Sequence, residues 1–177
     1  MPDQIKKVVV IGPESTGKST LTAALAKHYQ EPWVPEYARD YLYSLNRGYH
    51  FEDLLKIAKG QIEKEIELEE KADGLLFCDT DLHVIKVWSE HSFGKLDPWI
   101  KETMTSRRYD LYLLTDIDVP WEPDPLREHP HPKMRKYFFD LYHEYLKATG
   151  VPYLKISGDP QARLNAGIQA VDLILAP

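Results

Sequence analysis

The stretch VVVIGPESTGKST, residues 8–20, joins a run of β-branched residues to a glycine-rich turn and then to a helix-forming segment. The apolar run covers residues 5–12 and predicts a strand buried on both faces, as strands of parallel sheets usually are. Residues 18–29 repeat apolar side chains at helical spacing, so a helix is expected directly after the turn. Residues 8–20 therefore predict a strand, a tight loop and a helix in immediate succession.

The loop matches the phosphate-binding pattern G-x-x-x-x-G-K-[ST] at Gly12, Gly17, Lys18 and Ser19. Its glycines let the backbone curl so that N–H groups point inward, and the helix N-terminus adds partial positive charge. Lys18 is expected to reach the β- and γ-phosphates, and Ser19 to ligate Mg²⁺. An ordinary connecting turn with an incidental lysine is the alternative, which the strand and helix on either side disfavour. The predicted ATP-binding residues are Gly12, Pro13, Glu14, Ser15, Thr16, Gly17, Lys18, Ser19 and Thr20.

The rest of the chain alternates apolar runs with helical patterns, which predicts an α/β fold with a parallel sheet and helices on both of its faces. The whole of residues 1–177 is interpreted as a single domain. The many glutamates and lysines of the 51–72 helix predict a solvated face. Further strands are expected at 74–81, 109–116 and 151–157, a short strand or turn near 33–36, and helices at 37–42, 51–72, 82–88, 133–150 and 159–175.

Composition and charge narrow the classes of partner. The chain has 22 Lys and Arg against 28 Asp and Glu, a net charge of −6, which argues against a nucleic-acid partner. Its single cysteine excludes an internal disulfide. No uncharged apolar run approaches the roughly 20 residues of a membrane span, and the first residues lack an apolar signal segment. These features predict a cytoplasmic enzyme without a membrane partner.

Two acids follow the strand expected at 74–81. Asp79 comes directly after the buried run, at the carboxyl edge of the sheet and beside the phosphate loop, where it can hold Mg²⁺ or its waters. Asp81 is expected to face the acceptor, but a carboxylate that caps the next helix explains it equally well, because the helical pattern begins at Leu82.

The segment PEYARDY, residues 35–41, supplies the next candidate residues. Glu36 can take the proton of an acceptor hydroxyl, and Arg39, one helical turn later, can steer phosphate or pair with the substrate. A first-turn glutamate and an i,i+3 ion pair give the structural alternative. Tyr37 either lines the acceptor pocket or packs in the core.

A proline-rich insert at 118–133 has the length of a functional loop and predicts a lid over the triphosphate. Arg127, with Arg135 just beyond the insert, can supply positive charge to the transferring phosphoryl group. His129 and His131 are interpreted as surface residues, because no acid or cysteine completes a ligand set. Trp88 and Trp121 pack in the core or touch the substrate.

With GPESTGKSTL, PEYARDYL, FCDTD and LLTDIDVPWEPDPLR in this order, the chain resembles the nicotinamide-riboside kinase domain of the NadR-type proteins over nearly its whole length. The resemblance implies a P-loop NTPase fold with five parallel strands in a nucleoside-monophosphate-kinase-like arrangement. It implies transfer of the ATP γ-phosphate to the 5′-hydroxyl of nicotinamide riboside, which gives nicotinamide mononucleotide. The chain departs from the full-length proteins by leaving no room for an adenylyltransferase domain or a DNA-binding segment.

The resemblance also implies residue roles. It puts residues 12–19 on ATP, Asp79 near Mg²⁺, and Arg127 in the lid. It places Glu36, Tyr37 and Arg39 beside the acceptor, and has Trp88 or Trp121 stack on the nicotinamide ring. The general base stays open between Glu36 and the aspartates Asp79 and Asp81, and so do the adenine pocket and the oligomeric state.

Three other functions compete with this interpretation. A nucleotide switch that acts through a protein partner would be supported by a guanine-reading N-K-x-D segment, which the sequence lacks. A ring-forming mechanical ATPase is expected to carry a further helical domain after the nucleotide fold. A kinase for another nucleoside or nucleotide differs only in pocket shape, which the sequence hardly constrains.

Overall fold

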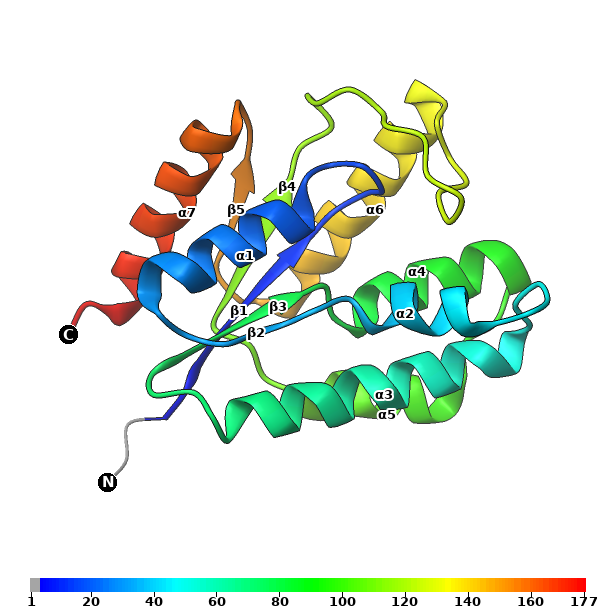
Figure 1. The fold of residues 1–177 in the computed structure, drawn as a ribbon, viewed down its shortest axis with the longest axis horizontal. Helices are drawn as coiled ribbons and strands as arrows, with labels where there is room; N and C mark the ends of the chain where they lie inside the picture. The colour runs from blue at the N-terminus through cyan, green and yellow to red at the C-terminus, as the bar shows by residue number, and fades with distance from the viewer. Residues whose placement is uncertain (1–3) are drawn as a thin grey trace.

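The computed structural model describes residues 4–177, in which five parallel strands form one sheet covered by helices on both faces (Figure 1). The order of the strands is β2-β3-β1-β4-β5, so β1 lies in the centre between β3 and β4. The predicted α/β fold with a parallel sheet is confirmed. The strands are β1 (Lys6–Ile11), β2 (Trp33–Val34), β3 (Leu75–Asp79), β4 (Leu111–Thr115) and β5 (Tyr153–Ile156).

The helices occur along the chain in the order that the sequence predicts, except for α5, which was not predicted. The Asp97 side chain caps it by accepting from Trp99 N at 2.8 Å, and Pro98 is its first residue. The helices are α1 (Lys18–Tyr29), α2 (Tyr37–Ser44), α3 (Phe51–Glu69), α4 (Leu82–Phe93), α5 (Pro98–Ser106), α6 (Pro132–Thr149) and α7 (Pro160–Leu175).

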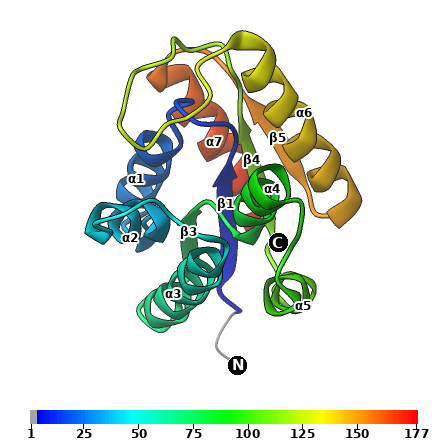
Figure 2. The same cartoon turned by 90° about the vertical axis from the view of Figure 1, so that its right-hand side faces the viewer.

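The central strand divides the core into two layers. α1 and α7 cover one face of the sheet, and α4 and α6 the other (Figures 1 and 2). Val8 and Val10 pack with residues of α1 and α7, whereas Val9 and Ile11 pack with residues of α4 and α6, as the alternation of side chains along a strand requires. All four side chains are fully buried, and each burial contributes about 1.5–3 kcal/mol. A third apolar cluster joins α3, α4 and α5, with Ile100 of α5 fully buried in it. The sheet and its helices are therefore joined by a continuous apolar core.

The predicted solvated face of the helix at 51–72 is wrong in part. Glu65 of α3 is fully buried, and its carboxylate accepts hydrogen bonds from Arg107 and from Tyr109 Oη, the latter at 2.9 Å. Asp53 is 1% exposed and accepts from Arg47 Nη1 at 2.7 Å. The partners of these acids come from other segments, so the acidic pattern of the helix alone could not distinguish buried from solvated positions.

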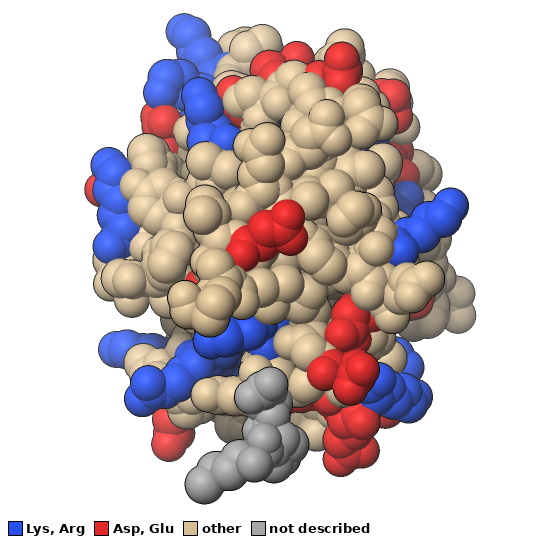
Figure 3. Space-filling view, turned by 90° about the vertical axis from the view of Figure 1, so that its left-hand side faces the viewer, with Lys and Arg blue, Asp and Glu red and all other residues tan. Residues whose placement is uncertain are grey.

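On the face that Figure 3 shows, acidic and basic side chains both occur, mostly around a broad area of other residues with one acidic group near its middle. Within residues 4–177, none of the helices combines the length and the apolar character that crossing a membrane demands.

Candidate active site

Because the strands are parallel, the loops that follow them gather at one edge of the sheet, where ligands bind in open α/β folds. The phosphate loop follows β1, Glu36 follows β2, Asp79 ends β3, and the segment 116–131 follows β4. The phosphate loop, Glu36 and residues 125–129 line one cavity of about 420 Å³. The topology thus brings residues from distant parts of the sequence to a common site.

The phosphate loop has the local geometry that its sequence requires. A Cβ atom on Gly12 would lie 2.3 Å from Thr115 Oγ1, so only glycine fits beside β4. Gly17 and Ser15 adopt left-handed conformations with φ of 78° and 57°. Lys18 Nζ lies inside the loop and donates to Pro13 O at 2.7 Å. The ammonium group is therefore positioned where the loop would enclose an anion.

Asp79 lies just beneath the cavity and fits a divalent cation. The Ser19 hydroxyl donates to Asp79 Oδ2, whereas Oδ1 is buried and has no hydrogen-bond partner among the described residues. Burial and the nearby charge of Glu36 raise the pKa of Asp79 to about 6. A serine hydroxyl beside a carboxylate with an open oxygen is a hard-oxygen donor set, which suits Mg²⁺.

Beyond the phosphate loop the cavity becomes an aromatic and aliphatic chamber. Glu36, the N-terminal capping residue of α2, belongs to the same cavity lining. The chamber combines apolar and aromatic walls with polar groups, as small-molecule sites do. Its apolar and aromatic lining consists of Leu42, Leu45, Tyr49, Val84, Val87, Trp88, His91, Phe138 and Tyr142.

The segment 118–131, which the sequence predicts to be a lid, arches from β4 over the phosphate loop towards α2 (Figure 2). The Glu14 carboxylate accepts from the backbone N–H groups of Glu128 at 3.1 Å and His129 at 3.2 Å. An ion pair between Arg39 of α2 and Asp124 of the lid joins the lid to the opposite wall. Because α6 begins at Pro132, the irregular segment after β4 ends at residue 131, next to the approximate end at 133 that the sequence predicts.

The structure brings most of the predicted site residues together. The cavity lining contains residues 12–20, Glu36, Arg39, Trp88 and Arg127. Asp79 reaches this group through Ser19. Two of the three candidate bases of the sequence analysis, Glu36 and Asp79, thus lie close together, since the charge of Glu36 contributes to the raised pKa of Asp79.

Three predicted acceptor residues do not line this cavity. Asp81 caps α4 by accepting from His83 N at 2.9 Å, and it accepts from Tyr112 Oη at 2.8 Å, so its carboxylate serves the helix start. The Tyr37 ring packs on α3 so closely that a Cβ on Gly60 would lie 2.2 Å from it. Trp121 is a half-buried residue of the lid. Asp81 thus caps a helix and Tyr37 packs in the core, which are the structural alternatives that the sequence left open for them.

The cavity also contains residues that sequence reasoning did not assign to it. His129, predicted to be a surface residue, lines the cavity, and its ring lies 4.8 Å from Phe138 and 5.2 Å from His91. His91 follows Val84 and Val87 on one face of α4, and this helical spacing is the signal that could have found it. Arg47 carried no such signal, because its contact with Asp53 depends on the chain reversal between α2 and α3.

Comparison with known proteins places this chain in a family. Residues 7–163 match the family described as "AAA domain". The chain belongs to this family. It is also 30% identical, over 159 residues, to the "Trifunctional NAD biosynthesis/regulator protein NadR" of Salmonella typhimurium strain LT2. That match covers 88% of this chain but 39% of the relative, so the chain spans less than half of the relative's length.

Solved structures agree with this family relationship. A "NadR protein in complex with NR" superposes with a TM-score of 0.81 at 26% identity, covering 97% of this chain and 50% of that one. A second structure, the "NadR protein in complex with NAD and AMP-PNP", superposes with a TM-score of 0.80 at 26% identity. That match covers 97% of this chain and 49% of the other. The thymidylate kinase from Ehrlichia chaffeensis superposes with a TM-score of 0.65 at 14% identity, and the match covers 97% of this chain and 98% of the kinase. This likeness shows a shared fold. The predicted resemblance to NadR-type proteins and the P-loop kinase fold are confirmed, and both support a phosphotransferase.

Proposed function

We propose that this chain is an ATP-dependent nucleoside kinase that phosphorylates the 5′-hydroxyl of nicotinamide riboside. The observation that carries the proposal is the single cavity that contains the phosphate loop, the Glu36 carboxylate and an aromatic chamber. A triphosphate on the loop and a ring-bearing acceptor in the chamber would meet beside Glu36. The phosphate loop alone would fit many activities, whereas this combination favours transfer to a nucleoside.

The family relationship supports both substrates. The NadR structures were solved with NR and with an ATP analogue, and each matches this chain at 26% identity over 97% of its length. Trp88 of the chamber offers an aromatic face on which a nicotinamide ring can stack. The ring of nicotinamide riboside carries a positive charge, which adds cation–π attraction to that stacking.

The proposed reaction is an in-line displacement at the γ-phosphorus. The acceptor 5′-oxygen forms a bond to phosphorus, the bond from phosphorus to the β,γ-bridging oxygen breaks, and ADP leaves. Glu36 takes the hydroxyl proton, while Lys18 and Arg127 balance charge on the phosphoryl oxygens. Closure of the lid over the loop excludes water, which would otherwise compete as the acceptor.

Ser19 and Asp79 are the residues that would hold Mg²⁺. When bound, the ion supplies neutralising charge to the β- and γ-phosphate oxygens. The open Oδ1 of Asp79 and the burial of its carboxylate are the features of this chain that fit the ion. Burial raises the pKa of Asp79 and so makes its ionisation more costly, a cost that a bound cation would offset.

The test is ADP release from Mg-ATP in the presence of separate nucleosides, including nicotinamide riboside, thymidine, deoxyadenosine and cytidine. The proposal expects nicotinamide riboside to stimulate ADP release most and to yield nicotinamide mononucleotide by mass spectrometry. Stimulation by another nucleoside alone would reassign the acceptor. ADP release that no acceptor changes would support an ATPase acting through a protein partner.

A further inference from the structure

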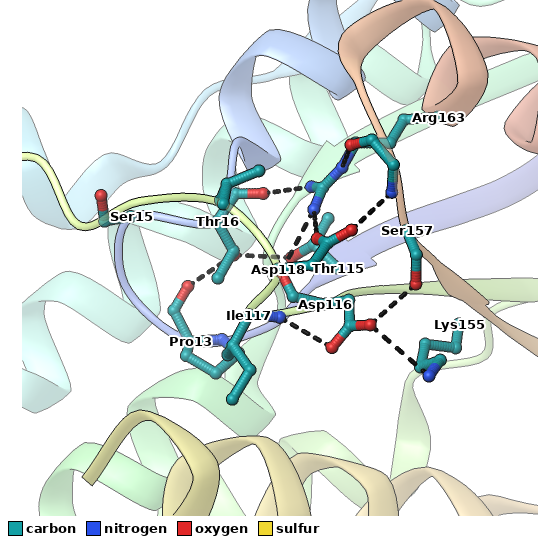
Figure 4. Close-up of polar contacts among 12 residues, drawn as sticks. Pro13, Ser15, Thr16, Thr115, Asp116, Ile117, Asp118, Lys155, Ser157 and Arg163 are labelled. Carbon is teal, nitrogen blue, oxygen red and sulfur yellow. Dashed lines mark hydrogen bonds and ion pairs between the residues drawn. The ribbon is translucent and has the colours of Figure 1, made fainter. Parts of the chain in front are cut away.

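A buried arginine lies behind the phosphate loop and outside the cavity lining (Figure 4). Arg163, in the first turn of α7, is 4% exposed. Its Nη1 donates to Thr16 O at 2.5 Å, its Nε donates to Gly158 O at 2.8 Å, and its Nη2 donates to Asp116 O at 3.2 Å. The same Nη2 group forms an ion pair with Asp118. One guanidinium thus bonds to three segments. They are the phosphate loop, the residues Asp116 and Asp118 directly after β4, here called the root of the lid, and the turn between β5 and α7.

The contact with Thr16 fixes the direction of a peptide unit in the phosphate loop. In a planar trans peptide the C=O and the following N–H point in opposite directions. The Thr16 carbonyl points back to Arg163, so the Gly17 N–H points away from it, towards the cavity that Gly17 lines. Thr16 Oγ1 is held as well, at 2.7 Å from both Pro13 O and Thr115 Oγ1. Both the backbone carbonyl and the side-chain hydroxyl of Thr16 are therefore held by hydrogen bonds.

The guanidinium lies close behind the loop, since a Cβ on Gly17 would be 3.6 Å from Arg163 Nη1. Its charge is paired with Asp118, and its other donors are used by carbonyl oxygens. Lys18, by contrast, lies inside the loop, where an anion would be enclosed. This arrangement suits a residue that orients the loop and does not itself contact phosphate.

We propose that Arg163 is a positioning residue that sets the Thr16–Gly17 peptide for binding the nucleotide phosphates and ties that peptide to the root of the lid. The proposal rests on the proposed function for the identity of the nucleotide. Loss of the guanidinium would free the Thr16 carbonyl to rotate, and the Gly17 N–H would rotate with it. The acceptor chamber lies on other elements, so its affinity for the nucleoside should change little.

The test uses Arg163→Met, which keeps the apolar stem, and measures the Kd of Mg-AMP-PNP by calorimetry together with the KM of each substrate. Hydrogen bonds from a charged group contribute about 1.5–3 kcal/mol, which corresponds to a roughly 10- to 100-fold weaker Kd. The KM for ATP should rise similarly, and the KM for the nucleoside should stay within about threefold. Arg163→Lys, which can restore one contact, should recover part of the nucleotide affinity.

Arg107→Met is the matched control, because Arg107 is also a largely buried arginine paired with a carboxylate, that of Glu65. Its network includes Lys7 near the amino end of β1, whereas the phosphate loop follows the carboxyl end. The control should lower the thermal midpoint but leave the Kd of Mg-AMP-PNP unchanged.

An Arg163→Met protein that is destabilised like the control yet binds Mg-AMP-PNP as the wild type does would overturn the proposal. Should that variant fail to fold, Arg163→Lys provides the decision, because it keeps a cationic donor at this point but cannot make all of the arginine's contacts. Wild-type affinity in the lysine variant would then overturn the role of Arg163. Failure of the wild-type chain to bind Mg-AMP-PNP would instead overturn the proposed function, and this inference with it.

Discussion

At the residue scale, the candidate site contains two carboxylates next to the phosphate loop, and they differ in their access to the cavity. Asp79 is buried and already bonded to Ser19, whereas Glu36 lines the cavity where an acceptor would enter. A general base must reach the acceptor hydroxyl directly or through one water. This difference in access supports the proposed metal role of Asp79 and the proposed role of Glu36 as the base.

Glu36→Gln tests that assignment. The amide keeps the size of the side chain but cannot take a proton, so kcat should fall by roughly 100-fold or more. The KM for ATP should stay within about twofold, because the phosphate loop is unchanged. Steady-state kinetics with both substrates varied provides the measurement, and an unchanged kcat would remove Glu36 from the base role.

Asp79→Asn should make the protein more stable at neutral pH in the absence of Mg²⁺. The pKa of Asp79 is raised from 3.8 to about 6, so the folded state binds this proton more tightly than the unfolded state does. The free energy of unfolding therefore falls as the pH rises from about 4 to 6 and stays lowered above that range. The cost is on the order of 3 kcal/mol, which corresponds to a thermal midpoint roughly 6–12 °C lower.

The asparagine variant lacks this ionisation, so it should exceed the wild-type midpoint at pH 7.5 in EDTA. The two midpoints should converge near pH 4, where the wild-type carboxyl is largely protonated. Scanning calorimetry at the two pH values measures both expectations. Equal midpoints at pH 7.5 would show that burial of this carboxylate carries no such cost.

At the element scale, the packing of α2 on α3 sets the position of Glu36. Gly60 lies within α3, where exchange of glycine for alanine ordinarily gains about 1 kcal/mol in helix propensity. Here a Cβ would lie 2.2 Å from the Tyr37 ring, which no real contact allows. The steric term is larger than the gain in propensity, because overpacking a core costs about 1–3 kcal/mol.

Gly60→Ala should therefore destabilise the protein by about 1–2 kcal/mol, and kcat should fall because Tyr37 directly follows Glu36. Chemical denaturation and steady-state kinetics measure the two effects. Gly74→Ala is the control, because a Cβ there would make only an ordinary contact, 3.5 Å from Glu31 Oε1, and Gly74 does not line the cavity. A Gly60→Ala protein as active and as stable as the wild type would contradict the described packing of Tyr37.

The lid depends on hydrogen bonds more than on its exposed ion pair with Arg39, since such pairs contribute little. Glu14→Ala removes the acceptor of two lid N–H groups, so kcat/KM for the acceptor should fall about 3- to 10-fold. Glu14→Gln keeps an acceptor oxygen and should stay within about twofold. Equal losses in both variants would indicate that the charge of Glu14, not its bonds to the lid, is what matters.

At the scale of the whole molecule, the site is assembled from loops that follow different strands, so a bound nucleotide should stabilise the entire fold. Mg-AMP-PNP at 100 times its Kd should add about 2.7 kcal/mol, which raises the thermal midpoint by roughly 5–10 °C. Lys18→Ala should abolish this shift, because it removes the ammonium group of the phosphate loop. A thermal shift of equal size in the two proteins would contradict binding at the loop.

Local patterns were sufficient for much of the architecture. The β-branched run before Gly12 predicted β1, and the loop, α1 and most later elements followed from periodicity and capping residues. Such features depend on neighbours in the sequence, since strand burial, helix spacing and N-terminal caps act over a few residues. The same reasoning found the phosphate loop, Glu36 and Asp79, because each follows a recognisable strand.

The sequence by itself thus determined the class of fold and the presence of a phosphate loop. Only the tertiary structure decided that Glu65 is buried, that Asp81 caps α4, and that Arg163 holds the Thr16 carbonyl. Each of these depends on a partner far away in the chain or on competition between two local partners. Arg163 and Thr16 are 147 residues apart, and only the parallel order of the sheet brings α7 behind the loop.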